Sequence, residues 1–194
     1  GITGALAAEH LTGLGHDVII VDREREGFGS TAASTAMLQW EIDLPLRRLA
    51  ELYGFDKAAD VYRRSFKAVE GLIESVATLG LGSAFHPRDT VYLAAGDIGP
   101  RELQEECALR SRAGLPGQLL DHATLLGHYG FDRAAAIVSP GSAEGDPLSL
   151  CHALLQVAAT RGAKLIRGEA VAFDSTAGSA AVTLGCGRTI EASH

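Results

Sequence analysis

Two adjoining stretches at the start of the chain decide the fold: Gly1-Ile-Thr-Gly4, which opens an Ala- and Leu-rich segment, and Asp17-Val-Ile-Ile-Val-Asp22, which follows it. Residues 2–14 contain no proline and are followed by glycine, which predicts a helix that ends at a glycine C-cap. The second stretch is continuously apolar and β-branched between two charged ends, a pattern typical of a buried parallel strand. A helix followed by such a strand predicts an α/β unit.

The spacing of the two glycines and the acidic residue matches part of a dinucleotide fingerprint. Gly1 and Gly4 correspond to the second and third glycines of G-x-G-x-x-G, and Asp22 lies 21 residues after Gly1. Gly1 would let the backbone approach a pyrophosphate, which the helix N-terminus favours, and Gly4 would allow close packing of helix on strand. The Asp22 carboxylate can accept a hydrogen bond from a ribose hydroxyl, and it disfavours NADP because it would repel a 2′-phosphate. The alternative is that the glycines merely begin a helix and that Asp22 merely ends a strand.

Composition and charge narrow the possible partners. The chain has 194 residues, 46% of them hydrophobic, and a formal net charge of -7 from 17 basic and 24 acidic residues. These values indicate a folded globular protein and argue against a nucleic-acid partner or an anionic membrane surface. The sequence contains neither a run of about 18 apolar residues nor a signal-peptide pattern, so we expect no membrane span.

The cysteines and histidines suggest neither a disulfide framework nor a metal site. Cys107, Cys151 and Cys186 are odd in number and form no C-x-x-C pair, which favours a reducing compartment and predicts a cytoplasmic protein. None of the seven histidines has a ligand spacing, so no metal site is predicted. Cys151 lies on an apolar helix face and is interpreted as a small buried side chain rather than a nucleophile.

The rest of the chain alternates between helical and strand patterns. One buried helix face is predicted between residues 56 and 79 from apolar residues at steps of three and four: Ala58, Tyr62, Phe66, Val69, Ile73 and Val76. Four acidic residues are interpreted as helix N-caps: Asp43, Asp56, Asp121 and Asp146. Other helices are predicted over 43–53, 100–112, from 121 onward and over 147–161, and strands over 90–94, 135–139, 164–167, 170–173, 180–184 and 188–191. The last two strands flank a hairpin signal at Gly185-Cys-Gly187.

Two segments are given ordinary structural interpretations. Met37, Leu38 and Trp40 are predicted to pack in the core, with Gln39 bonded to backbone groups, in preference to an approach to a cofactor. The mixed charge run over 101–106 is predicted to be a solvated helix face. The chain begins inside a motif, and residues 188–194 form a strand pattern with nothing after it, so we expect a fragment of a longer protein.

Three stretches together resemble one protein family. They are Gly1-Ile-Thr-Gly-Ala5 to Asp22-Arg23, then Gly29-Ser-Thr-Ala-Ala-Ser-Thr-Ala-Met-Leu38, and then Ser142-Ala-Glu-Gly-Asp-Pro147 with Leu154-Leu155 and Arg161-Gly-Ala163. In this order they are similar to the FAD fingerprint, the loop around the flavin pyrophosphate and ribityl chain, and the return from the substrate domain in FAD-dependent oxidoreductases of the D-amino acid oxidase and glycine oxidase type. The fingerprint's acidic residue is more often Glu in that family. The family's first strand, its later Ala-Thr-Gly-like strand and its C-terminal half are missing from this sequence.

The resemblance implies FAD as the cofactor and assigns residues to it. Gly1, Thr3 and Gly4 would face the pyrophosphate, and Asp22 with Arg23 the adenosine end. The pyrophosphate and ribityl oxygens would be contacted by Ser30, Thr31, Ala32, Ala33 and Ser34, since small side chains expose backbone N–H groups and hydroxyls add donors. Val171 would lie on the adenine, and packing in the core is an equal alternative for this residue. For the loop over 30–34 the alternative is an ordinary polar connection without a ligand. In the family the later half of the chain holds the substrate carboxylate, so no catalytic residue is named.

The fold expected is α/β: an incomplete, Rossmann-like parallel sheet that binds FAD, with part of a second, α+β substrate domain. Residues 1–80 and 141–194 are assigned to the FAD-binding domain and residues 81–140 to the substrate domain. The intact enzyme would oxidise a C–N bond of a small-molecule amino acid or secondary amine by hydride transfer to flavin N5. The alternatives are an NAD-dependent dehydrogenase, which would not need the loop over 30–34, and a catalytically inactive dinucleotide-binding module. The substrate, the electron acceptor, covalent attachment of FAD and the oligomeric state stay open.

Overall fold

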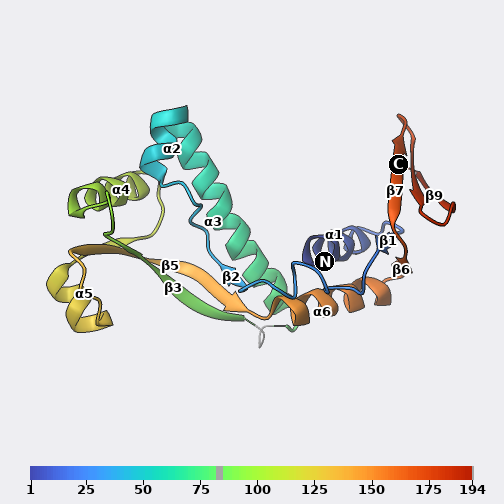
Figure 1. Ribbon diagram of the computed structural model, residues 1–194, viewed down its shortest axis with the longest axis horizontal. Helices are drawn as coiled ribbons and strands as arrows, with labels where there is room; N and C mark the ends of the chain where they lie inside the picture. The colour runs from blue at the N-terminus through green and yellow to red at the C-terminus, as the bar shows by residue number, and fades with distance from the viewer. Residues whose placement is uncertain (82–84, 194) are drawn as a thin grey trace. The chain divides into compact units, whose positions relative to one another are not determined.

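A computed structural model describes residues 1–81 and 85–193 of the chain (Figure 1). The chain divides into two compact units: unit 1 is Gly1–Thr35 with Asp146–His194, and unit 2 is Ala36–Gly145. The boundary expected near residue 80 differs from this division, because residues 36–80 pack with the sheet of unit 2. Which unit serves as which functional domain stays a prediction.

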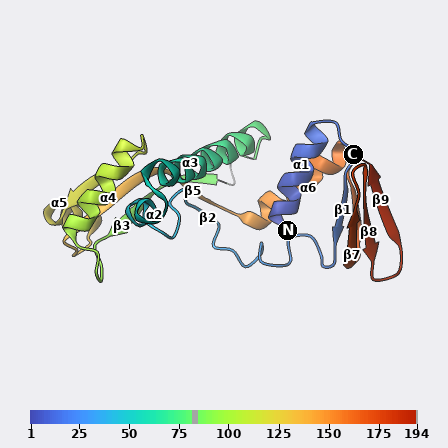
Figure 2. The same cartoon turned by 90° about the horizontal axis from the view of Figure 1, so that it is seen from above.

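Two helices that pack against each other form the helical part of unit 1. α1 (Ile2–Gly13) and α6 (Pro147–Thr160) lie side by side in both views (Figures 1 and 2). Both helices bury alanine, at Ala5 and Ala8 on α1 and at Ala158 on α6, and small side chains allow a close approach. The predicted cap at Asp146 is confirmed: its carboxylate accepts the N–H groups of Leu148 at 2.9 Å and Ser149 at 3.1 Å.

A two-stranded parallel sheet follows the helices. β1 (Ile19–Asp22) pairs in parallel with β6 (Lys164–Arg167), with Ile19 opposite Lys164 and Asp22 opposite Arg167. The parallel direction confirms the prediction for β1, but the expected burial is wrong. Ile19 is 44% exposed, because β1 has β6 as its one strand partner among the described residues and the other edge is uncovered.

The end of the chain forms an antiparallel sheet. β7 (Ala170–Ser175), β8 (Ser179–Leu184) and β9 (Thr189–Ser193) follow one another as a meander (Figure 2). The predicted hairpin is confirmed: Gly187 has a φ of 83°, and the Leu184 N–H donates to the Arg188 carbonyl at 2.8 Å. His194, the last residue of the expected strand, lies outside the described residues.

The sheet of unit 2 is built on one long strand. β5 (Ala135–Gly145) pairs antiparallel with β3 (Phe85–Leu93), β2 (Met37–Leu38) and β4 (Gln118–Asp121). The strands predicted at 90–94 and 135–139 are confirmed in place but run longer. β2 and β4 were not predicted, because each contains only two consecutive apolar residues, Met37-Leu38 and Leu119-Leu120, which is too short a pattern to indicate a strand.

Four helices complete the described part of unit 2. They are α2 (Leu46–Tyr53), α3 (Phe55–Thr78), α4 (Pro100–Arg112) and α5 (His122–Tyr129). Asp121 caps α5 as predicted, since its carboxylate accepts the Thr124 N–H at 2.9 Å. The caps predicted at Asp43 and Asp56 are wrong: α2 begins after Pro45 and α3 begins after Gly54, so Asp56 already lies in the first turn.

The core of unit 2 forms around Trp40 and the buried face of α3. Ala58, Tyr62, Val69 and Val76 of the predicted stripe are buried, and the other two members, Phe66 and Ile73, pack against the same cluster. The prediction for Trp40 is confirmed, because it is fully buried and its indole N–H donates to the Pro140 carbonyl at 2.9 Å.

Two residues outside this face, Met37 and Glu106, contradict their predicted burial or exposure. Met37, predicted to pack, is 61% exposed. Its neighbour Gln39, predicted to bond backbone groups, is exposed. Met37 lies on the short strand β2, at the margin of the sheet. Glu106, predicted to lie on a solvated face, is 2% exposed.

Candidate cofactor-binding site

A cavity of about 450 Å³ lies within unit 1 at the ends of the two parallel strands. Because β1 and β6 run in parallel, their carboxyl ends meet at the same edge, which is where ligands bind in open α/β sheets. Residues at three places in the sequence line it: Gly1; Val21 to Arg25 with Gly27 to Thr31; and Gly168 to Ala170. The lining therefore combines the start of α1 with the segments that follow β1 and β6.

Gly1, the N-cap residue of α1, lines this cavity, and the first turn that follows it has free backbone donors. The Ala5 N–H donates to the Gly1 carbonyl at 3.1 Å, which is the first hydrogen bond within the helix. The Ile2 N–H donates to the Thr31 hydroxyl at 3.0 Å. Among the described residues the N–H groups of Thr3 and Gly4 have no recorded acceptor, as expected for the first turn of a helix. These two N–H groups and the helix dipole favour an anion.

Asp22 ends β1 with both carboxylate oxygens in local hydrogen bonds. Oδ1 accepts the Glu24 N–H at 3.1 Å, and Oδ2 accepts from the Gly1 nitrogen at 3.3 Å. The side chain is 29% exposed, so it keeps access to the cavity. Each carboxylate oxygen can accept more than one hydrogen bond, which leaves capacity for a hydroxyl group of a ligand.

Arg23 lies at the same edge, held by two carboxylates. Its Nη1 is 3.3 Å from Glu169 Oε1, and its Nε is 3.4 Å from Glu24 Oε1. All three side chains are more than half exposed, so these ion pairs contribute little to stability and leave the arginine able to reorient.

The backbone of the loop after β1 contacts side chains of α6. Gly27 has a φ of 80°, and a Cβ built on it would collide with Leu148 Cδ1. The Glu26 carbonyl is 3.1 Å from His152 Nε2. Within the loop the Ala32 N–H donates to the Gly27 carbonyl at 3.0 Å, so this turn is compact. The loop therefore requires glycine at position 27, which the sequence analysis did not single out.

The structure brings together part of the predicted site. Gly1, Asp22, Arg23, Ser30 and Thr31 line the cavity. The other predicted residues are not among those that line it: Thr3, Gly4, Ala32, Ala33, Ser34 and Val171. Val171 is 58% exposed on β7, directly after the lining residue Ala170. Whether each of these residues contacts a cofactor stays a prediction.

Sequence reasoning missed the segment Gly168 to Ala170. It follows β6, whose carboxyl end lies beside that of β1, and it contributes Glu169 to the edge of the cavity. The signal was present, because a strand pattern at 164–167 that pairs in parallel with β1 must end at the same edge. Arg25 and Phe28 were also missed; the Arg25 guanidinium lies 5.1 Å from the centre of the Phe28 ring.

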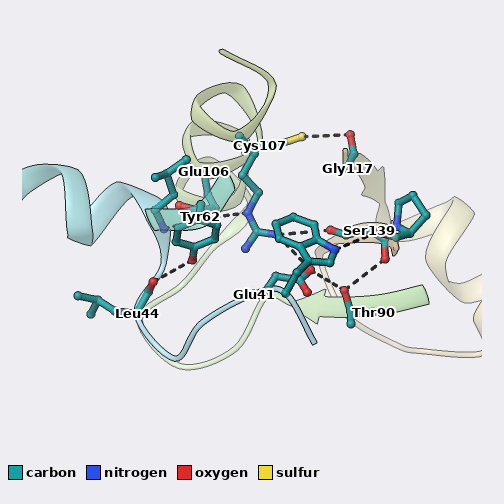
Figure 3. A network of polar contacts seen from close by, with 12 residues as sticks. Glu41, Leu44, Tyr62, Thr90, Glu106, Cys107, Gly117 and Ser139 are labelled. Atoms are coloured by element: carbon teal, nitrogen blue, oxygen red, sulfur yellow. Dashed lines mark hydrogen bonds and ion pairs between the residues drawn. The ribbon is translucent and has the colours of Figure 1, made fainter. Parts of the chain in front are cut away.

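A second, smaller cavity of about 190 Å³ lies within unit 2 beside a buried polar network (Figure 3). Arg110, 3% exposed, donates from Nε to Glu106 at 2.8 Å and lies 3.4 Å from Glu41 through Nη1. The Thr90 hydroxyl donates to the same Glu41 oxygen at 2.5 Å. The other oxygen, Glu41 Oε2, is buried and has no partner among the described residues. Arg110 and Glu41 thus join α4 to the segment after β2, and Thr90 adds β3 to the network.

Three aromatic side chains surround this arginine. The Arg110 guanidinium lies 5.5 Å from the ring centre of Trp40 and 5.8 Å from those of Tyr62 and Tyr92. The Tyr62 hydroxyl donates to the Leu44 carbonyl at 2.8 Å (Figure 3). Burial, and then the charge of Glu106, raise the pKa of Tyr62 above its usual value, so this hydroxyl stays protonated and serves as a donor.

Two remaining expectations concern metals and membranes. Among residues 1–81 and 85–193, no group of three or more His, Cys, Asp or Glu side chains could hold a metal ion. In the same part of the chain no helix is both long and apolar enough to cross a bilayer.

Cys151 is buried, as predicted, and burial raises the pKa of its thiol, which makes it a poor nucleophile.

Comparison with known proteins assigns the family. Residues 1–193 match the family described as FAD dependent oxidoreductase, of the D-amino acid oxidase type (DAO). The chain belongs to this family. No curated protein matches the sequence.

Solved structures of DAO-fold enzymes share the fold of this family member. L-proline dehydrogenase from P. horikoshii superimposes with a TM-score of 0.76 and 19% identity, over 98% of this chain and 48% of that one. Iminodiacetate oxidase from Chelativorans sp. BNC1 gives 0.70 and 26%, over 99% and 51%. Glycine oxidase from Geobacillus kaustophilus gives 0.74 and 22%, over 99% and 51%. The DAO chain described here thus spans about half the length of the structures it matches.

Proposed function

We propose that the intact protein binds FAD in the unit 1 cavity and oxidises a C–N bond of an amino acid or a secondary amine. The observation that carries the proposal is the cavity at the shared edge of β1 and β6, which Gly1 at the start of α1 helps to line. Membership of the FAD-dependent DAO family supports the cofactor, and the matched oxidases and dehydrogenase support the substrate class.

The residues around the cavity fit FAD on three counts. The N–H groups of Thr3 and Gly4 are left without acceptors among the described residues, so a pyrophosphate would satisfy them. Gly1 lines the cavity and has no side chain, so a ligand can approach the backbone there. Asp22 supplies an acceptor suited to a ribose hydroxyl.

In this proposal each part of the chain has a distinct task. The first turn of α1 binds the pyrophosphate, with Thr31 and Ser30 beside it, and Asp22 with Arg23 holds the adenosine end. The loop over 32–34 and Val171 complete the predicted contacts. When bound, the flavin supplies the acceptor for the hydride that leaves the substrate carbon. Residues 1–80 and 141–194 form the FAD-binding domain in this proposal, and residues 81–140 begin the substrate domain.

The proposal is tested on the full-length protein. We expect it to purify with the two visible absorption bands of an oxidised flavin, and we expect anaerobic addition of glycine, L-proline or iminodiacetate, one at a time, to bleach at least one band. NAD is titrated by calorimetry as the comparison. Colourless protein that binds NAD and not FAD would favour the dehydrogenase alternative. Protein that binds FAD but is reduced by no amino acid or secondary amine would favour the inactive module.

A cytoplasmic location belongs to the same proposal and rests on the cysteine content. The three cysteines are all free. Fractionation of the source cells, with detection of the full-length protein by antibody, provides the measurement.

A further inference from the structure

Helix α1 has an N-terminal cap that comes from a distant part of the sequence. Gly1 stands at the N-cap position and has no side chain to bond the free N–H groups of the first turn. The Thr31 hydroxyl accepts the Ile2 N–H instead, at 3.0 Å, from 29 residues further along the chain. Thr31 is 4% exposed, so this hydrogen bond is shielded from water and is stronger than one on the surface.

Gly1 and Thr31 also compete for the same space. A Cβ built on Gly1 would lie 3.0 Å from Thr31 Oγ1, which is tighter than an ordinary van der Waals contact. An alanine at position 1 would therefore push the hydroxyl away from the Ile2 N–H. This gives the glycine a reason that does not involve any ligand: it leaves room for the capping hydroxyl.

Both residues line the cavity, so the cap and the cavity share their walls. The loop that carries Thr31 is itself compact, since the Ala32 N–H donates to the Gly27 carbonyl and the Ser34 N–H to the Thr31 carbonyl. A hydroxyl that accepts one hydrogen bond keeps its own hydrogen to donate. The bond between Ile2 and Thr31 therefore fixes the loop against the helix end and leaves the N–H groups of Thr3 and Gly4 for a ligand.

We propose that Thr31 is a positioning residue for the cofactor: its hydroxyl caps α1 and holds the loop against the helix N-terminus, and Gly1 is glycine in order to admit that hydroxyl. This inference rests on the proposed function for the identity of the cofactor. The cap is made of protein atoms alone, Thr31 Oγ1 and the Ile2 N–H, so it is measurable separately from cofactor binding.

The test uses the full-length protein with and without FAD. Thr31→Val removes the hydroxyl at nearly constant volume, and we expect it to weaken FAD binding about five- to tenfold and to lower the urea midpoint of the apoprotein. Thr31→Ser keeps the hydroxyl. We expect its dissociation constant for FAD to lie within about twofold of wild type and its urea midpoint to return towards the wild-type value. FAD binding is measured by quenching of flavin fluorescence.

Thr12→Val is the matched control on the same helix. Thr12 is also buried, and its hydroxyl donates to the Ala8 carbonyl at 2.8 Å. We expect this variant to lower the urea midpoint and to leave the dissociation constant of FAD unchanged, since the site lies far along α1 from the cavity.

A double-mutant cycle separates the cap from a direct contact with the cofactor. Gly1→Ala should lower the apoprotein midpoint in the wild-type background, and it should lower it much less in a Thr31→Ala background, where the hydroxyl is gone. Additive effects in the apoprotein, or an unchanged apoprotein midpoint for Thr31→Val, would overturn the inference. Wild-type protein that binds no FAD would contradict the proposed function, whereas wild type that binds FAD as tightly as Thr31→Val does would contradict this inference alone.

Discussion

Glu106 is the residue on which the stability of unit 2 is expected to depend most. It lies on α4, yet its carboxylate caps α2: Oε1 accepts the Leu46 N–H at 3.0 Å, and Oε2 accepts the Arg47 N–H at 2.7 Å. The same Oε1 accepts from Arg110 Nε at 2.8 Å. The Glu106 and Arg110 side chains are each 3% exposed, so water is not available to replace these bonds.

The cost of Glu106→Ala follows from what the substitution leaves behind. Each buried N–H that loses its acceptor costs about 1–3 kcal/mol. Removing one partner of a buried ion pair costs about 3–5 kcal/mol, because the other charge stays buried. These terms overlap, so we expect a loss of about 4–5 kcal/mol, a large part of the about 5–15 kcal/mol available to a folded domain. Glu106→Gln keeps one acceptor oxygen and should cost about half as much.

Arg110→Met provides the sharper comparison. It removes the same ion pair but leaves Glu106 in place to cap α2, and the methionine chain can fill part of the space between Tyr62 and Tyr92. We therefore expect Arg110→Met to destabilise the protein less than Glu106→Ala does.

The assay is urea unfolding of the full-length protein, followed by far-UV circular dichroism. Glu105→Ala is the control: Glu105 is the next residue on α4, and its side chain is 48% exposed and pairs with Arg101 at 3.4 Å. We expect less than about 0.5 kcal/mol for this control. A free energy of unfolding for Glu106→Ala as close to wild type as that of Glu105→Ala would refute the capping argument.

Three further predictions follow from single contacts. Asp22→Ala should weaken FAD binding in the full-length protein by about 1–3 kcal/mol, and Asp22→Asn by less, whereas Asp17→Ala at the other end of the strand should have no effect in the same fluorescence titration. Gly141→Ala should cost about 1–3 kcal/mol in urea unfolding, because Gly141 has a φ of 93° and a Cβ would lie 2.7 Å from Phe66 Cε2; Gly178→Ala, with open space around it, should be neutral. Hydrogen bonds from Ser149 lower the pKa of Asp146 in the folded protein. The Asp146 carboxylate therefore stabilises the fold at pH values above its pKa in the unfolded chain, about 3.9, and this contribution is lost as the pH falls through the lower pKa of the folded state. The difference in unfolding midpoint between wild type and Asp146→Asn should therefore shrink in acid.

Local signals predicted the helices and strands well where one segment decides its own structure. The helix over 100–112 has the predicted bounds, and the caps at Asp121 and Asp146 are confirmed because each carboxylate bonds N–H groups two or three residues ahead. The parallel direction of β1 was likewise visible in its continuous apolar run.

Predictions failed where a distant residue supplies what the local sequence lacks. Asp43 is close to the start of α2 and of the right residue type, but Glu106, 60 residues from Leu46, takes the N–H group that a cap would bind. The wrong assignment of Glu106 to a solvated face has a similar cause. Its carboxylate accepts hydrogen bonds from the start of α2, which is distant in the sequence, and from Arg110, four residues further along α4. Only the second of these partners lies within the helix pattern. A charge run on one helix therefore does not reveal which of its members is buried.

The unit 1 cavity combines local and long-range information. Gly1 and Asp22 were recognisable because the fingerprint is a local spacing, whereas Gly168 to Ala170 join the cavity only through the pairing of β6 with β1. Thr31 belongs to both classes: it was predicted from a hydroxyl-rich loop as a ligand for phosphate, and the structure adds the bond to Ile2 that no spacing in the sequence specifies. A glycine in such a fingerprint is usually explained by the approach of the ligand. At Gly1 the nearest side chain is the capping hydroxyl of Thr31, so the fold itself favours glycine there, independently of any ligand.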